Sequence, residues 1–403
     1  LLDKGRTEFS IESTIRRQLS IYETILRRQK RRRERRRDGV VICGAYGRGN
    51  AGDDAILEAI LQEMRSIDPD MPATVVSKDP KSTRLSYRVR AVSQTNVLGW
   101  LRAMRRARLY INGGGSLIQD VTSRRSLWFY LMNIRAAKWA GCRVQMYGCG
   151  IGPVTRADHR RLTAKVLNRN VDVITLREPD SLEELKSMGV TEPEIRLAAD
   201  PALTLSPASE EKTDSVLLRA GIPPHGRDLC FALRPWPGFQ EKAPLFGEAA
   251  RYAWESHGLT PVFAAVEKGQ DPAAARLAAR SLGEGTPCYF LDDAGAAGTM
   301  IGALARMEAV VSMRLHALIF AAGQGIPLAG VVYDPKVSAF LRYIGQENFA
   351  DLEDLTAEKL REMIDHAVAQ AADKQAQAEA VRRLRELERG NVEVARKELG
   401  IIN

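Results

Sequence analysis

Short apolar runs alternate with longer amphipathic stretches along most of the chain, from Gly39 onward. The runs have the length and composition of buried strands, and the stretches between them have helical periodicity. This alternation predicts parallel sheets built from βαβ units. The predicted strands are VVICG (40–44), TVV (74–76), RLYI (108–111), RVQMYG (143–148), VDVITL (171–176), IRLAAD (195–200), LCFAL (229–233), LTPVFAA (259–265), AVVS (309–312) and PLAGVVY (327–333).

One break interrupts the alternation at residues 206–227, where Pro, Gly and Ser gather as in a linker. We therefore expect an α/β fold with two Rossmann-like domains, at 39–205 and 228–350. The polar, heptad-like stretch at 351–403 predicts C-terminal helices. Two doubly wound domains facing each other across a cleft place their strand-end loops around it, and ligands of such sheets bind there.

Residues 1–38 form a basic arm. They hold 13 Lys and Arg against 6 Asp and Glu, which is +7 of the chain's net charge of +9. Ile11, Ile15, Leu19 and Tyr22 recur at helical spacing, so the arm predicts an amphipathic helix. Such a helix favours an anionic membrane surface; a solvated tail, a partner helix and nucleic-acid binding are the alternatives. No nucleic-acid-reading motif accompanies the charge, so we expect no nucleic-acid partner.

The rest of the composition is that of a soluble globular protein. It is 45% hydrophobic and 27% charged, and no apolar run approaches the roughly 20 residues of a membrane span. The five cysteines are scattered and form no CxxC pair, which favours a reducing compartment. With no signal-peptide pattern, we expect a cytoplasmic protein, peripheral at the inner face of the cell membrane.

The loop after the first predicted strand is rich in glycine. Its candidate anion-binding residues are Gly49, Asn50, Gly52 and Asp53. Backbone N–H groups in such a loop, together with the start of the following helix, favour phosphate or carboxylate. The spacing matches neither GxGxxG nor a Walker loop. A plain strand-to-helix turn, with Asp53 as an acid in the first helical turn, explains the same residues.

A second candidate loop is Asn112, Gly113, Gly114 and Gly115, after RLYI. Three consecutive glycines are entropically unfavourable in an ordinary turn, so they predict close backbone approach to a ligand or to the neighbouring domain. The glycines at 148–152 repeat the pattern, and helix packing against the sheet explains them equally well.

Cationic and titratable side chains follow three apolar strands. Arg314 and His316 follow AVVS, Lys336 follows PLAGVVY, and Arg177 follows VDVITL. In extended chain, residues two apart point to the same side, so Arg314 and His316 can converge. Taken alone, such a histidine is more often a structural hydrogen-bonding group. The sequence shows no His, Cys, Asp and Glu cluster with metal-ligand spacing, so we expect no metal.

Together these motifs resemble the polysaccharide pyruvyl transferase family, most closely its CsaB-type branch, over about residues 40–344. The matching motifs are GNAGD (49–53), NGGGSLIQD (112–120), GIGP (150–153), SMRLHALIFAAGQGIP (312–327) and YDPK (333–336). The resemblance implies two Rossmann-like domains in a GT-B arrangement and transfer of a pyruvyl group from phosphoenolpyruvate. It further implies a lipid-linked saccharide acceptor, containing N-acetylmannosamine in the CsaB case, and a ketal product. Arg177 and Lys336 match the family's donor-binding residues, and Arg314 and His316 match its Arg–His pair.

Elementary chemistry agrees with the resemblance. Phosphoenolpyruvate carries roughly three negative charges near neutral pH and suits a basic cleft. Ketal formation needs a proton carrier, for which His316 is the expected residue, and no cofactor beyond phosphoenolpyruvate as co-substrate. The alternatives are a GT-B glycosyltransferase that uses a nucleotide-sugar donor and a catalytically silent binding scaffold.

Overall fold

The computed structural model describes residues 10–33 and 37–401. The first domain contains a parallel sheet of seven strands in the order β3-β2-β1-β4-β5-β6-β7, which is the strand order of a doubly wound Rossmann fold. The strands are β1 (Val40–Cys43), β2 (Ala73–Ser77), β3 (Arg90–Ser93), β4 (Leu109–Ile118), β5 (Arg143–Ile151), β6 (Val173–Leu176) and β7 (Glu194–Leu197).

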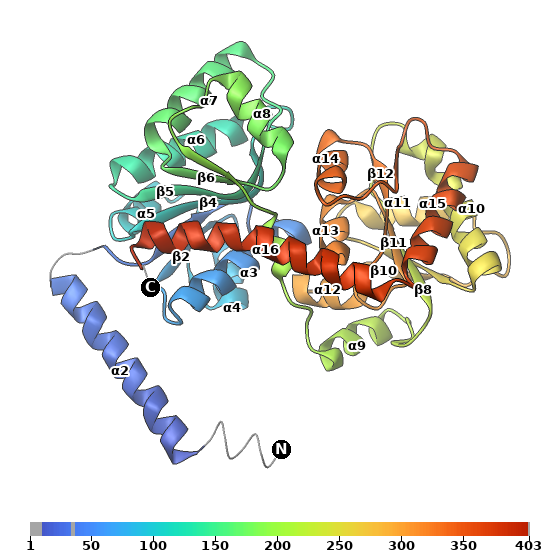
Figure 1. Cartoon of the computed structure of the whole chain (residues 1–403), viewed down its shortest axis with the longest axis horizontal. Coiled ribbons are helices and arrows are strands. Elements are labelled where there is room, and N and C mark those ends of the chain that lie inside the picture. The colour runs from blue at the N-terminus through green and yellow to red at the C-terminus, as the bar shows by residue number, and fades with distance from the viewer. Residues whose placement is uncertain (1–9, 34–36, 402–403) are drawn as a thin grey trace.

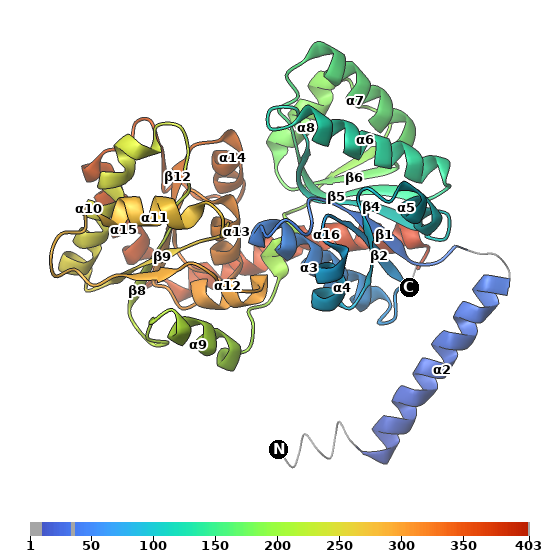
Figure 2. The same ribbon diagram turned by 180° about the vertical axis from the view of Figure 1, so that it is seen from behind.

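Helices cover both faces of this sheet, as its continuous apolar strands require (Figure 2). Side chains alternate along β1, so that Val40 and Ile42 pack on one face, and Val41 and Cys43 on the other. The first face receives α3 (Ala51–Ile67) and α4 (Pro80–Tyr87), and the second receives α5 (Val97–Met104), α6 (Arg124–Trp139), α7 (Ala157–Asn170) and α8 (Pro179–Met188).

The second domain repeats the plan with a parallel sheet of six strands, ordered β10-β9-β8-β11-β12-β13. The strands are β8 (Asp228–Ala232), β9 (Thr260–Ala264), β10 (Tyr289–Leu291), β11 (Ala309–Ser312), β12 (Leu328–Val332) and β13 (Phe349–Asp351). Its helices are α10 (Phe239–His257), α11 (Asp271–Ala279), α12 (Ala297–Leu304), α13 (Leu315–Gly323), α14 (Pro335–Tyr343) and α15 (Ala357–Gln370). The predicted linker at 206–227 contains a helix, α9 (Glu210–Arg219), which packs against α12.

The two domains share one hydrophobic core cluster. It runs from α3 of the first domain through the short helix η1 (Pro201–Thr204) to α12 and α13 of the second. The long helix α16 (Lys374–Leu399) leaves the second domain and returns to lie along the first (Figure 1). Its buried residues Ala395 and Leu399 belong to the core cluster on the α3 side of the first domain, so the chain joins the domains twice.

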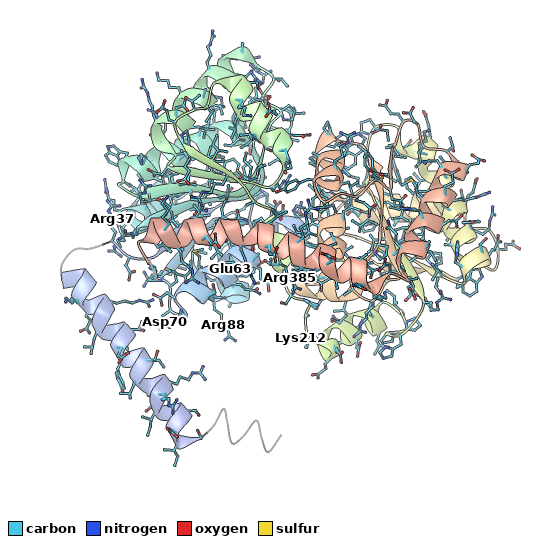
Figure 3. The ribbon with its side chains drawn as sticks, in the orientation of Figure 1. Arg37, Glu63, Asp70, Arg88, Lys212 and Arg385 are labelled. Carbon is cyan, nitrogen blue, oxygen red and sulfur yellow. The ribbon has the colours of Figure 1, made fainter. Side chains whose placement is uncertain are left out.

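The predicted amphipathic helix of the arm is present as α2 (Ile11–Arg33), and its apolar side chains Ile11, Leu19 and Tyr22 are exposed. Arg28 pairs with Asp68 at 3.3 Å, on the side of the first domain where Arg37, Asp70 and Arg88 are labelled in Figure 3. The rest of the predicted arm, residues 1–9 and 34–36, lies outside the described residues. Across the described chain, no helix combines the length and apolar character needed to cross a bilayer.

Candidate functional site

The start of α3 meets the second domain directly. The backbone of Asn50 bridges to Glu267, and the Ala51 N–H donates to the carbonyl of Val266 over 3.3 Å. Asn50 also caps α3, because its side-chain oxygen accepts a hydrogen bond of 2.9 Å from the Gly52 N–H. The first glycine loop therefore lies at the contact between the domains, next to the carboxyl ends of strands from both sheets.

His316 packs against this loop from the opposite domain. It is in the first turn of α13, directly after β11. A Cβ atom on Gly52 would lie 2.0 Å from the imidazole Nδ1, far inside van der Waals contact. Position 52 therefore has no room for a side chain, and the glycine is what lets the imidazole lie against the α3 backbone. The histidine's Nε2 has no hydrogen-bond partner among the described residues.

The charges around His316 include all three of the cations predicted for the site. Burial lowers the pKa of His316 to about 4, and Asp200 opposes the shift. The positive charges of Arg177, Lys336 and Arg314 reinforce it. The imidazole is therefore neutral at pH 7 and can accept a proton.

Arg177 is held in a fixed position by three neighbours. Its guanidinium donates to Glu178 at 2.8 Å, to Asp200 at 3.0 Å and to the Ser116 hydroxyl at 3.0 Å. A Cβ on Gly150 would lie 3.0 Å from the guanidinium, so the glycine in GIGP makes room for it. Burial opposes the charge, but the two carboxylates outweigh it and raise the pKa of Arg177. The sequence revealed neither carboxylate as a partner, since both pairings depend on how the chain folds at the sheet edge.

Arg314 and His316 are not both in extended chain. Arg314 is the extended residue that caps α13, whereas His316 is already helical, so the chain turns between them. The expected convergence required both residues to be extended. The guanidinium instead donates to Asp271 at 3.0 Å through Nε and to Glu267 at 2.9 Å through Nη2. Arg314 thus links the start of α13 to the chain around the start of α11.

Asp53 is the second titratable group at the domain contact. Burial raises the pKa of Asp53 to about 7, the neighbouring carboxylate of Asp54 reinforces the shift, and Arg48 opposes it. Asp200 and Arg177, which act on His316, also act on Asp53. The same two charged groups therefore influence Asp53 in the first domain and His316 in the second; the pKa of Asp53 is raised and that of His316 is lowered.

The second glycine-rich segment is not a loop. Residues 112–115 lie inside β4, which continues through them because Gly113 and Gly115 still pair with β5. A Cβ on Gly113 would meet the Tyr46 hydroxyl at 2.2 Å, and one on Gly114 would meet Ile56 at 2.4 Å. These two glycines admit Tyr46 and α3 of their own domain, rather than a ligand or the neighbouring domain.

Only Gly115 of this segment lies near the site. It has a positive φ of 78°, and a Cβ there would be 3.6 Å from an Asp53 carboxylate oxygen. Asn112 is fully buried within the sheet, and its amide has no hydrogen-bond partner in the described part of the chain. Gly49, in the first loop, has a positive φ of 76° and open space around it.

A cationic and aromatic group lies at the ends of β8 and β12, and the sequence analysis found its Lys336 but missed Arg234. Lys336 pairs with Asp334 at 3.0 Å and lies 5.8 Å from the centre of the Tyr333 ring. Arg234 donates to the Tyr333 hydroxyl at 2.7 Å and stacks on the rings of Tyr333 and Trp236. Its Nε is buried without a hydrogen-bond partner among the described residues. The signal for Arg234 was its place directly after the apolar strand LCFAL.

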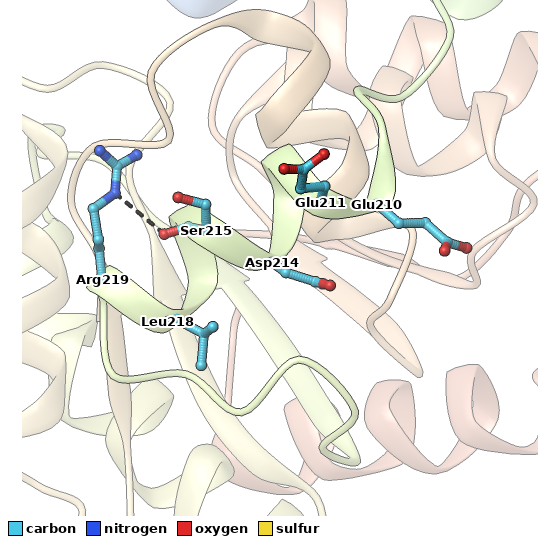
Figure 4. Close-up of a pocket in the computed structure, with 6 residues that line it drawn as sticks. All are labelled: Glu210, Glu211, Asp214, Ser215, Leu218 and Arg219. Atoms are coloured by element: carbon cyan, nitrogen blue, oxygen red, sulfur yellow. Dashed lines mark hydrogen bonds between the residues drawn. The ribbon is translucent and has the colours of Figure 1, made fainter.

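One hollow, of about 660 Å³, lies away from these groups, along α9. Figure 4 shows Glu210, Glu211 and Asp214 along this helix, with Arg219 donating to the Ser215 carbonyl at 3.2 Å. An acidic lining is unsuited to an anionic donor. In the described residues, no group of three or more His, Cys, Asp or Glu side chains is arranged to hold a metal ion.

Two doubly wound domains that meet through the start of α3 and the start of α13 define a two-domain α/β protein of the GT-B type. The folds of solved structures agree. Anabaena HepE in complex with UDP-glucose has a TM-score of 0.60 at 10% identity, over 89% of this chain and 100% of that one. A putative UDP-N-acetylglucosamine 2-epimerase from Listeria monocytogenes has a TM-score of 0.59 at 13% identity, covering 86% and 91%. A glycosyltransferase from Rickettsia africae has a TM-score of 0.59 at 11% identity, covering 90% and 99%.

The sequence model described as polysaccharide pyruvyl transferase matches residues 50–335. The chain belongs to this family, which is a family of transferases that act on polysaccharides. The match contains the contact between Gly52 and His316 and the Arg177 cluster, and it ends at Pro335, one residue before Lys336. A search of curated proteins found no match.

Proposed function

We propose that the protein transfers the pyruvyl group of phosphoenolpyruvate to a sugar of a cell-wall or surface polysaccharide precursor, forming a ketal and releasing phosphate. The observation that supports this most strongly is the contact of His316, a neutral imidazole influenced by Arg177 and Lys336, with Gly52 at the start of α3, next to Asp53 with its raised pKa. A base, an acid and two cations are what the reaction of an enol phosphate with a diol requires.

The proposed reaction has two steps that restore both groups. In the first step, His316 accepts the proton of the attacking sugar hydroxyl, and Asp53 donates a proton to the methylene carbon. In the second step, the Asp53 carboxylate accepts the proton of a second hydroxyl, and the imidazolium donates its proton to the departing phosphate. Atoms and charge balance over the two steps, and His316 and Asp53 end in their starting protonation states.

The donor's carboxylate and phosphate are bound best by cations whose hydrogen bonds are not already taken by carboxylates of the protein. Lys336 has a single carboxylate partner, and Arg234 has an aromatic hydroxyl but no carboxylate among the described residues. Arg177 contributes positive charge from a fixed position. We therefore assign direct contact with the donor to Lys336 and Arg234. We propose that Arg177 favours the anionic donor through its charge and that Arg314 positions α13 and its His316.

Phosphate release tests the function. The protein, incubated with phosphoenolpyruvate and a panel of lipid-linked saccharides, is expected to release inorganic phosphate only when a suitable acceptor is present. The competing function, a glycosyltransferase with a nucleotide-sugar donor, predicts instead that a UDP-sugar and not phosphoenolpyruvate raises the thermal unfolding temperature. Protection by the UDP-sugar alone would replace the proposal with that alternative.

The basic arm suits an acceptor that is held in a membrane. We propose that residues 1–38 increase residence on anionic membranes without a part in the chemistry, since the apolar face of α2 is exposed and the arm is strongly basic. Deleting the arm is expected to leave turnover on a water-soluble acceptor intact while weakening binding to anionic vesicles. If vesicle binding is unchanged after the deletion, the alternative interpretations, in which the arm packs on a partner chain or binds nucleic acid, would be favoured.

A further inference from the structure

The outer face of α6 exposes large apolar side chains on the folded body, separate from the arm. Trp128 is 53% exposed, Met132 48% and Trp139 72%. Their spacings of four and seven residues place them on one stripe of the helix. Single exposed apolar residues are ordinary on protein surfaces, but two tryptophans and a methionine in one stripe form a contiguous patch.

The patch is hollowed and edged by arginine. A depression of about 620 Å³ runs between α6 and α7, and it is lined by Trp128, Trp139 and Leu162 together with Arg125 and Arg135. No ion pair to a carboxylate occupies either arginine in the described part of the chain. A surface with an apolar floor and a cationic edge differs from one that is buried in a protein core, and it also differs from a helix face that contacts only water.

The surrounding sequence is almost free of acid. Residues 81–157, which contain α5 and α6, hold fourteen Lys and Arg but one acidic residue, Asp120. Asp120 is buried and bonded to His159 at 2.8 Å, so it does not offset the surface charge. Arg105, at the end of α5, stacks over the Trp139 ring at 5.3 Å. Lys138 and Arg143 in this stretch pair with Asp172, whereas Arg125 and Arg135 border the patch.

Charge complementarity distinguishes between the possible binding partners of the patch. A second copy placed on the same face would bring two basic surfaces together, and the basic helix α2 would be repelled in the same way. An anionic lipid surface is attracted by the arginines and accepts tryptophan at its interface, where an apolar ring and a polar N–H are both satisfied. Lys and Arg near such a surface each contribute favourably.

We propose that this face of α6, with Trp128, Met132 and Trp139 at its centre, docks the folded body on an anionic membrane. Arg37 anchors the end of the arm at the C-terminal ends of α5 and α6, donating to the Met104 carbonyl at 3.3 Å. The arm therefore joins the body beside the patch, and both contact the same lipid surface. The docking does not depend on the proposed activity.

Tryptophan quenching tests the docking directly in the full-length chain. With vesicles of phosphatidylglycerol and phosphatidylcholine that carry brominated acyl chains, we expect quenching of the protein's emission. The Trp128→Phe/Trp139→Phe variant is expected to lose it. The matched variant Trp236→Phe/Trp254→Phe, altered in the second domain, is expected to keep it. Vesicle-bound protein whose emission is not quenched would overturn the proposal.

Charge variants provide a second test in which the arm is unchanged. Arg125→Gln/Arg135→Gln is expected to weaken binding to the anionic vesicles about 30-fold, at about 5-fold for each charge removed. The control Arg219→Gln/Arg280→Gln removes two exposed charges from the second domain and is expected to have no effect. Equal affinity of the two variants for the vesicles would contradict the membrane assignment. A dimer in solution that Trp139→Ser dissociates would also contradict it, and would favour a second copy of the chain as the partner of the patch.

Discussion

Replacing Gly52 with alanine isolates the contact between the domains. The added Cβ would lie 2.0 Å from the imidazole Nδ1 of His316, and ordinary contact needs about 3.5 Å. Either the imidazole or the second domain must therefore move by about 1.5 Å. A misplacement of this size in an active site lowers turnover by about 10²-fold, so we expect Gly52→Ala to reduce kcat by at least that factor.

The effect on stability should be much smaller. Alanine is favoured over glycine inside a helix by about 0.5 to 1 kcal/mol, and Gly52 is the second residue of α3. Overpacking costs about 1 to 3 kcal/mol, so the two effects largely offset each other. Thermal unfolding followed by circular dichroism should show a native-like protein.

Gly269→Ala is the matched control, because position 269 has an ordinary φ and nothing within 4 Å of an added Cβ. Phosphate release with phosphoenolpyruvate and a water-soluble acceptor gives kcat for both variants. We expect the control to match the native chain. Native turnover in Gly52→Ala would refute the reasoning, since His316 could not then require its observed place against α3.

Three further predictions concern the charged groups. His316→Gln should lower kcat by about 10²-fold or more while leaving donor affinity nearly unchanged. Donor binding and turnover are measured separately, and near-native turnover would mean that the histidine has a structural role. Lys336→Ala should raise the KM for phosphoenolpyruvate about 10- to 150-fold, and an unchanged KM would remove it from the donor site. Because Asp53 must be protonated and its pKa is about 7, activity should fall as pH rises through about 7. Asp54→Asn should move this fall to lower pH and Arg48→Gln to higher pH; shifts in the same direction would assign the titration to another group.

The positions of the site residues were predictable because strands and their ends can be located from apolar runs. Arg177, His316 and Lys336 each follow such a run, and parallel strands place their carboxyl ends along one edge of a sheet. The structure confirmed the two-domain α/β fold that these apolar runs predict. The edge strands β3, β10 and β13 were missed, since each has only three or four residues.

Pairings between distant side chains were not predictable. Asp271 lies 43 residues from its partner Arg314, and no periodicity links them. The glycines of residues 112–115 were expected in a loop, because glycine disfavours strand interiors. The neighbouring strand β5 and the side chain of Tyr46 decide that conformation, and both are remote in sequence. The raised pKa of Asp53 likewise arises from burial that only the assembled domains provide.

The return of α16 to the first domain affects how the chain folds during synthesis. Domains made first generally fold first, but the first domain here receives Ala395 and Leu399 from the last helix. Until those residues leave the ribosome, part of the apolar surface on the α3 side remains uncovered. The nascent first domain is therefore a substrate for chaperones throughout translation of the second, and a stop codon shortly before Lys374 would leave two nearly complete domains that aggregate.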